Sequence, residues 1–267
     1  MITNDDNLRF ESICRAVAEE GLLGEGIGTM AEKRMHKALK RYICPDESCH
    51  EIRIKPDGTP STEDREKAES GRGGYIADIY KDGEIFEIQT GGFYPLKKKI
   101  EFYLKHTDFK ITVVHPLIEK KWSVWVDAET GETTNRRRSP KKEKIYDLLP
   151  EIFWLSEYID NDRLCFLSPI IEAEEYRMLD GWSKDKKKGS SRYERIPVSL
   201  IDEVNFSARM VSELLPEGLG EEFTAPEFSK ATGLRGRKAY YALKLICIAG
   251  GAEKGEKRGR SFVYKRR

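Results

Sequence analysis

The chain has 267 residues, of which 39% are hydrophobic and 35% are Asp, Glu, Lys or Arg. This length is enough for one large domain or for a medium and a small one. No apolar run is long enough to span a bilayer, and no basic-then-apolar stretch resembles a signal segment, so we expect a cytoplasmic protein without a membrane partner. Five cysteines without regular spacing indicate reduced thiols rather than a disulfide framework.

The formal net charge of +1 hides an uneven distribution of charge along the chain. Residues 230–267 contain twelve Lys and Arg against two Glu, a net charge of +10, which leaves −9 for the rest of the chain. A block this basic is typical of a segment that binds a polyanion. DNA is therefore the partner that we expect.

Helical spacing of apolar residues predicts two helices near the N-terminus, followed by a strand and a polar loop. The two helices span residues 8–21 and 32–42, the strand spans residues 50–55 and the loop spans residues 56–74. Thr29 and Glu32 have the spacing of a capping box at the start of the second helix.

The next stretch, residues 75–104, has the pattern of a β-hairpin followed by an amphipathic helix. Asp82-Gly83 is a pair typical of a type I′ turn. Side chains alternate across a strand, so Asp78 in the first strand should converge with Glu87 and Gln89 in the second. Burying unpaired carboxylates is costly, and a bound divalent cation would remove that cost.

Asp78, followed after a short hairpin by Glu87-Ile88-Gln89 and then a helix, resembles the core of the PD-(D/E)xK nuclease superfamily. The predicted helix over residues 94–106 and strand over residues 110–116 complete the α-β-β-β-α-β order of that superfamily. The resemblance implies an α/β, restriction-endonuclease-like fold with a mixed central sheet. It also implies that Asp78 and Glu87 hold Mg²⁺ or Mn²⁺, and that the third motif residue positions or activates water.

Gln89 stands where the superfamily usually has a lysine. Glutamine can orient a water molecule, but it cannot act as an acid or a base. Other members take a lysine from the following helix, which here begins with Lys97, Lys98 and Lys99; we select Lys97 as the catalytic candidate, and a solvated helix face is the alternative. Glu32 also has two interpretations, as a third metal ligand of the kind found in many such nucleases or as part of the capping box alone.

Beyond this core, the pattern predicts two strands, a basic arm and a helix. They span residues 122–126 and 164–176 for the strands, 133–144 for the arm and 145–158 for the helix. Arg136, Arg137 and Arg138 in the basic arm are candidates to bind backbone phosphates, and a solvated surface is the alternative. We expect the nuclease-like domain to span residues 1–181 and a basic linker to span residues 182–204.

Residues 205–267 resemble a small winged helix-turn-helix domain. Three helices over residues 205–215, 226–232 and 235–249 precede a hairpin over residues 252–267. The candidate DNA contacts are outward-facing residues of the third helix and the wing: Arg235, Arg237, Lys238, Tyr241, Lys244, Lys257, Arg258 and Arg260. A helical protein-interaction domain with a basic surface is the alternative.

Together these patterns predict a metal-dependent DNA endonuclease, a deoxyribonuclease directed to DNA by its C-terminal winged helix. The alternative is a DNA-binding regulator whose inactive nuclease-like domain serves for homodimer formation or DNA grip. Glutamine in place of the usual lysine at position 89 favours this alternative. The presence of the carboxylates of Asp78 and Glu87 argues against it. A third reading, an RNA-binding factor, lacks the aromatic pattern of RNP motifs.

Overall fold

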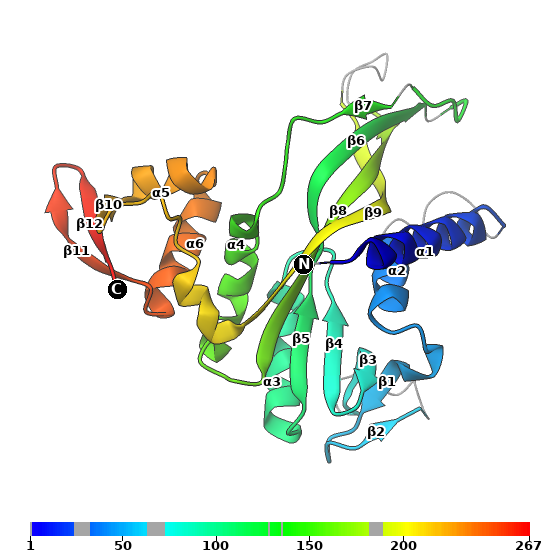
Figure 1. Ribbon diagram of the computed structural model, residues 1–267, viewed down its shortest axis with the longest axis horizontal. Coiled ribbons are helices and arrows are strands. Elements are labelled where there is room, and N and C mark those ends of the chain that lie inside the picture. Colours follow the sequence, from blue (N-terminus) through cyan, green and yellow to red (C-terminus); the bar gives the residue numbers. More distant parts are fainter. Residues whose placement is uncertain (1, 24–32, 63–72, 128, 135, 182–188) are drawn as a thin grey trace. The chain divides into compact units, whose positions relative to one another are not determined.

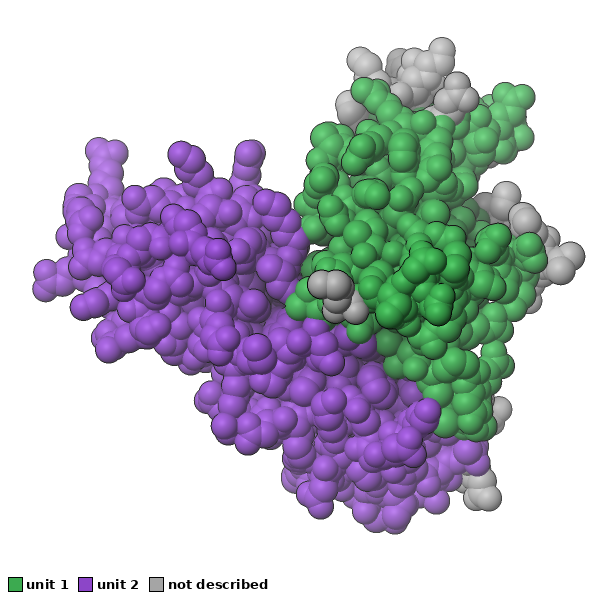
Figure 2. Space-filling view, in the orientation of Figure 1, with its two compact units in different colours: residues 1–50, 116–143, 168–204 green, residues 51–115, 144–167, 205–267 purple. Residues whose placement is uncertain are grey.

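The computed structural model describes residues 2–23, 33–62, 73–127, 129–134, 136–181 and 189–267. The chain forms two compact units, which Figure 2 shows in different colours. Unit 1 comprises residues 1–50, 116–143 and 168–204, and unit 2 comprises residues 51–115, 144–167 and 205–267. Both units are therefore discontinuous in sequence.

Unit 1 combines two helices with long strands (Figure 1). Its elements are α1 (Asn4–Leu23), α2 (Lys33–Ile43), the short η1 (Glu47–Cys49), β6 (Leu117–Asp127), β7 (Arg137–Arg138) and most of β8 (Leu164–Leu179) and β9 (Ser191–Ser207). β6 is parallel to β8 and antiparallel to β7, and β9 pairs with β8. Among the described residues, no helix combines the length and the apolar character needed to cross a membrane.

Unit 2 contains the predicted hairpin within a mixed sheet. The strand order is β2 (Pro60–Ser61), β1 (His50–Ile54), β3 (Tyr75–Lys81), β4 (Glu84–Ile88), β5 (Lys110–Val114) and the first residues of β8. β3 and β4 are antiparallel, whereas β5 is parallel to both β4 and β8. The helix predicted after the hairpin is η3 (Tyr94–Leu96) followed directly by α3 (Lys97–His106). An α/β architecture with a mixed central sheet is thus confirmed.

The rest of unit 2 consists of short helices and a three-stranded sheet. Its elements are η4 (Ile145–Asp147), α4 (Leu149–Ile152), η5 (Phe153–Tyr158), η6 (Ala208–Glu213), β10 (Glu222–Thr224), α5 (Ala225–Thr232), α6 (Arg237–Ile248), β11 (Ala252–Arg258) and β12 (Ser261–Arg266). β12 lies between β10 and β11 and is antiparallel to both. Gly233 at φ 79° ends α5 in the left-handed region, which allows the tight turn into α6.

Three predicted boundaries differ from the structure. The helix predicted over residues 145–158 is divided into η4, α4 and η5, because Pro150 suits the first turn of α4 and cannot continue a preceding helix. The described part of the predicted linker forms β9 from Ser191 onwards. β9 continues to Ser207, where the sequence predicted a helix, because it pairs with β8.

Candidate active site

The two carboxylates predicted to converge lie on the same side of the β3–β4 hairpin. The antiparallel register places Ile79 opposite Phe86, and alternation of side chains from this pair puts Asp78 and Glu87 together on the other face. Oδ2 of Asp78 accepts a hydrogen bond from the backbone N–H of Ile88 at 2.7 Å. The negative charges of the two side chains are near enough to repel one another.

Glu87 is buried against α3, with an exposed fraction of 1%. Lys99 donates a hydrogen bond to its Oε2 at 2.6 Å, and the Tyr103 hydroxyl donates one to its Oε1 at 2.9 Å. Burial raises the pKa of Glu87 to about 7; Lys99 opposes this rise and Asp78 adds to it. Burial lowers the pKa of Lys99, but the two carboxylates outweigh this effect and raise it, so the ammonium group stays charged.

Of the three lysines that begin α3, Lys99 reaches the carboxylates. Lys97 instead forms an ion pair with Glu157 at 2.7 Å, and Lys98 is exposed. Residues four apart lie on one face of a helix, so Lys99 faces the same way as buried Tyr103. The positive charge beside Glu87 therefore comes from Lys99, whereas the sequence had favoured Lys97.

Gln89 lies just beyond β4, where the chain turns into η3. Its backbone N–H donates a hydrogen bond to the carbonyl of Val114 at 2.8 Å, and its own carbonyl lies 2.6 Å from Nδ1 of His115. Its side-chain amide donates a hydrogen bond to the carbonyl of Gly92 at 2.6 Å. The amide nitrogen of Gln89 therefore holds this turn in place.

The donor chemistry of the site fits a hard divalent cation. Asp78 and Glu87 offer carboxylate oxygens, and a cation would relieve the repulsion between two acids of which one is buried. Within the described parts of the chain, no group of three or more His, Cys, Asp and Glu side chains is arranged to hold a metal. Glu32, the third predicted ligand, lies outside the described residues. Two carboxylates with water completing the coordination is a common way for proteins to bind Mg²⁺.

Most of the predicted DNA contacts near the C-terminus are exposed. These exposed residues are Arg235, Arg237, Lys238, Lys244, Lys257, Arg258 and Arg260. Tyr241 differs, because it is half-buried and its ring stacks on that of Phe153 with a centroid separation of 4.8 Å. Tyr241, predicted to face outward, is therefore only partly exposed. Removing a large ring from water and stacking it on another aromatic ring is favourable.

The basic arm after β6 has one arginine whose charge is compensated within unit 1. Arg136 forms ion pairs with Glu172 at 3.1 Å and with Glu174 at 2.9 Å, and its guanidinium lies 4.2 Å from the ring centroid of Trp122. Arg137 and Arg138 form β7 and are exposed. Arg137 and Arg138 are thus the better placed of the three to contact phosphate.

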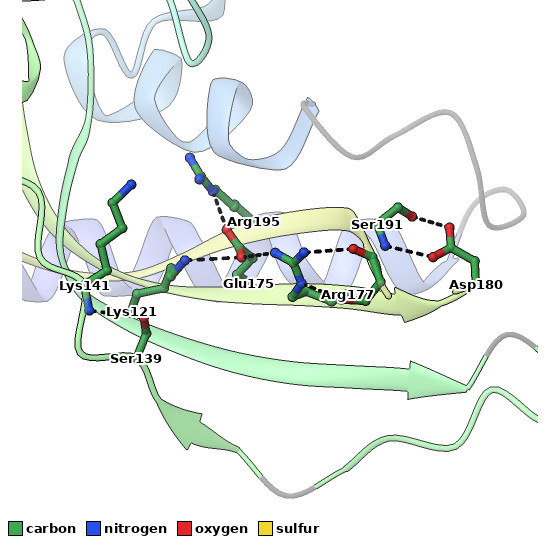
Figure 3. A network of polar contacts seen from close by, with 9 residues as sticks. Lys121, Ser139, Lys141, Glu175, Arg177, Asp180, Ser191 and Arg195 are labelled. Carbon is green, nitrogen blue, oxygen red and sulfur yellow. Dashed lines mark hydrogen bonds and ion pairs between the residues drawn. The ribbon is translucent and has the colours of Figure 1, made fainter. Parts of the chain in front are cut away.

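A second buried acid, Glu175 on β8, gathers three cations in unit 1 (Figure 3). Its side chain is 3% exposed and contacts Lys121 at 3.3 Å, Arg177 at 2.9 Å and Arg195 at 3.0 Å. Burial raises the pKa of Glu175, but the hydrogen bonds and charges of these cations outweigh it and lower the pKa to about 2. No local sequence pattern indicates this network, because its members lie on the separate strands β6, β8 and β9.

Replacing Glu175 with glutamine is expected to lower the free energy of unfolding by about 3 kcal/mol at pH 7, because three clustered cations lose their counter-charge. A lowered folded-state pKa gives stability that is present above about pH 4.5 and is lost as the pH falls through about 2. The difference between wild type and variant should therefore shrink in acid. Urea denaturation measures it.

Glu119→Gln is the matched control for this experiment, because Glu119 forms an exposed pair with Lys142 at 3.8 Å. Losing a surface pair changes stability by less than about 1 kcal/mol. Equal losses of stability in the Glu175→Gln and Glu119→Gln variants would contradict the organising role of Glu175.

Comparison with known proteins identifies the family of this chain. A family model described as a domain of unknown function, DUF8091, matches residues 60–207, which is more than half of the chain. The chain belongs to the DUF8091 family. The DUF8091 region contains Asp78, Glu87 and Lys99 and ends where β9 ends.

Similarity to one relative of this DUF8091 protein extends beyond the family region. An uncharacterized protein of Treponema pallidum (strain Nichols) is 26% identical over 250 residues, covering 90% of this chain and 87% of the relative. The similarity therefore spans most of the length of both proteins. No solved structure shows a significant match.

Proposed function

We propose that this DUF8091 protein is a metal-dependent DNA endonuclease whose active site is the carboxylate pair of the central hairpin. One observation carries the proposal: Lys99 pairs with buried Glu87 at 2.6 Å, near enough to Asp78 for the three charges to act on one another. Two acids and a lysine on a hairpin and its following helix are the functional groups of a PD-(D/E)xK site. The antiparallel β3–β4 pair and the parallel β4–β5 pair support a restriction-endonuclease-like core.

Phosphodiester hydrolysis needs an activated water and compensation of negative charge on the phosphate. Asp78 and Glu87 would hold Mg²⁺ or Mn²⁺ through their carboxylate oxygens. Such a cation, when bound, lowers the pKa of water and neutralises charge on the phosphate oxygens. Tyr103 fixes the orientation of Glu87 by its hydrogen bond at 2.9 Å. Lys99, which pairs with Glu87 at 2.6 Å, would also donate an N–H group to a phosphate oxygen and so supply the charge that Gln89 lacks.

The C-terminal segment would supply affinity for DNA. The order η6, β10, α5, α6, β11, β12 is the order of elements in a winged helix. Arg237 and Lys238 are exposed at the start of α6, the helix that would enter the major groove. Lys257 and Arg260, exposed at the turn of the β11–β12 hairpin, would contact backbone phosphates.

The decisive experiment compares plasmid cleavage by the wild type and by Asp78→Ala. The wild type is expected to nick supercoiled DNA in Mg²⁺ or Mn²⁺ and to leave it intact in EDTA. Asp78→Ala should leave the plasmid intact in every condition but bind DNA as the wild type does in a gel-shift assay. A folded wild type that cuts neither plasmid nor oligonucleotide in either metal would overturn the enzyme proposal.

A DNA-binding regulator with an inactive nuclease-like domain is the second candidate. The ion pair between Lys99 and Glu87 favours it, because the buried carboxylate already has a positive partner without a metal ion. In that case the wild type would bind DNA and cut none, and Asp78→Ala would change only stability or DNA affinity.

A further inference from the structure

A row of aromatic rings begins at Tyr94, seven residues after Glu87 in the chain. The rings of Tyr94, Trp154, Tyr241 and Tyr240 follow one another with centroid separations of 5.0, 5.7 and 5.5 Å. They come from η3, η5 and α6, three segments of unit 2 that are far apart in sequence. We call these four residues the aromatic row.

The two ends of the aromatic row are open to solvent, whereas its middle is packed. Tyr94 is 65% exposed and Tyr240 is 60% exposed. Trp154 and Tyr241 are half-buried, and Tyr241 also stacks on Phe153. Each exposed ring is therefore braced by a neighbouring ring. A tyrosine held in this way offers a large contact surface at a low cost in side-chain entropy.

Cations accompany the aromatic row. The ammonium group of Lys244 lies 5.3 Å from the ring centroid of Phe153, and Arg237 and Lys238 are exposed on α6 just before Tyr240. The sequence of α6 contains no Asp or Glu. Exposed rings among cations are the features that bind single-stranded nucleic acid, because bases stack on the rings and phosphates meet the cations. Bases inside a duplex are already stacked and must be extruded first.

The Tyr94 end of the aromatic row is connected to the candidate active site. Gln89 comes two residues after Glu87, and its side-chain amide holds the carbonyl of Gly92 at 2.6 Å. Tyr94 follows this turn after Phe93 and begins η3. A base that stacks on Tyr94 would therefore lie beside the end of the strand that carries Glu87.

We propose that the aromatic row binds unpaired bases of single-stranded DNA, with Tyr94 and Tyr240 as the stacking rings. The preferred substrate then contains a single-stranded segment next to the cleaved bond. This statement about substrate class rests on the proposed endonuclease function, but binding of the single strand can be measured without cleavage.

The test measures DNA binding in EDTA by fluorescence anisotropy, with a labelled oligothymidine and a blunt duplex of the same length at one salt concentration. Tyr94→Ala and Tyr240→Ala should each lower the affinity for the single strand about tenfold and change the affinity for the duplex less than about twofold. Tyr94→Phe and Tyr240→Phe keep the ring and should bind as the wild type does. Leu8→Ala removes a 51% exposed apolar side chain outside the aromatic row and serves as the control.

Equal losses of affinity for the single strand and the duplex would overturn the proposal, as would unchanged single-strand affinity in both alanine variants. Both tyrosines are exposed, so the urea midpoint of each variant should match that of the wild type. A ring-dependent affinity for single strands in a protein that cuts no DNA would support the aromatic row and reject the endonuclease. If the protein cuts DNA but its affinity for the single strand does not change when either ring is removed, the endonuclease proposal is supported and the aromatic-row proposal is rejected.

Discussion

Replacing Lys99 with methionine is expected to lower the rate of DNA cleavage at saturating Mg²⁺ by about 10³-fold, because one charge about 4 Å from the reacting phosphate contributes up to about 4 kcal/mol. Lys99 lies 2.6 Å from Glu87 and its side chain is 21% exposed, so solvent screens it only in part. Methionine preserves the length of the apolar stem and removes the ammonium group. Initial rates of cleavage of a labelled oligonucleotide measure the effect.

Lys97→Met is the matched control, since Lys97 begins the same helix and pairs with the exposed side chain of Glu157. It should cut at close to the wild-type rate, and Lys99→Arg, which keeps the charge, should cut faster than Lys99→Met. Without its ammonium partner, buried Glu87 takes up a proton rather than unfolding the chain, which urea denaturation can check. Equal rates in folded Lys97→Met and Lys99→Met would remove Lys99 from the mechanism.

The hairpin illustrates how much of the candidate site the local sequence contains. Asp82 and Gly83 adopt φ values of 50° and 79°, as a type I′ turn requires. This turn fixes the register of β3 against β4, and the register alone decides that Asp78 and Glu87 share a face. The carboxylate pair could therefore be predicted from one short stretch of the chain.

Which of the three lysines reaches Glu87 depends on the rotation of α3 about its own axis. Lys97, Lys98 and Lys99 are neighbours in sequence but point in different directions around α3. Burial of Ile100 and Tyr103 sets that rotation and turns Lys99 towards the sheet. The signal was present in the sequence, because Lys99 precedes Tyr103 by one helical turn.

Contacts between segments that are distant in the sequence could not be predicted from the local sequence pattern. The part of the chain after Ser191 was predicted as a linker because it is charged, yet it forms a strand by pairing with β8. Tyr241 was predicted to face outward, and the positions of Phe153 and Trp154 in space explain why it is half-buried. Arg195 likewise finds Glu175 on another strand. Composition and periodicity describe one segment at a time, so partners of this kind stay hidden.

The affinity of the wild type for Mg²⁺ or Mn²⁺ is expected to rise about tenfold per pH unit below pH 7 and to level off above it, because the proton on Glu87 competes with the cation. Burial raises the pKa of Glu87 to about 7, with Lys99 opposing and Asp78 adding to the rise. Between pH 5 and pH 8 the expected gain is about 100-fold. Isothermal titration calorimetry with Mn²⁺ measures it, and the cleavage rate at low metal concentration should follow.

The stability of the metal-free protein is expected to change in the opposite direction. The ordinary pKa of a glutamate is 4.5, and that of folded Glu87 is raised to about 7. Its contribution to stability is therefore fully present below pH 4.5 and is lost as the pH rises through 7, by about 3 kcal/mol in total. Mg²⁺ at pH 8 should restore part of this loss, because the cation binds the folded state.

Glu87→Gln separates the effect of this carboxyl group from all other titrations. The variant has no proton to lose at this position, so its stability should fall less between pH 5 and pH 8 than that of the wild type, and its metal affinity should be low at both values. Glu119→Gln, with an exposed side chain, should keep both wild-type pH dependences. Identical pH profiles for Glu87→Gln and the wild type would mean that Glu87 carries its charge throughout and that its burial does not control metal binding.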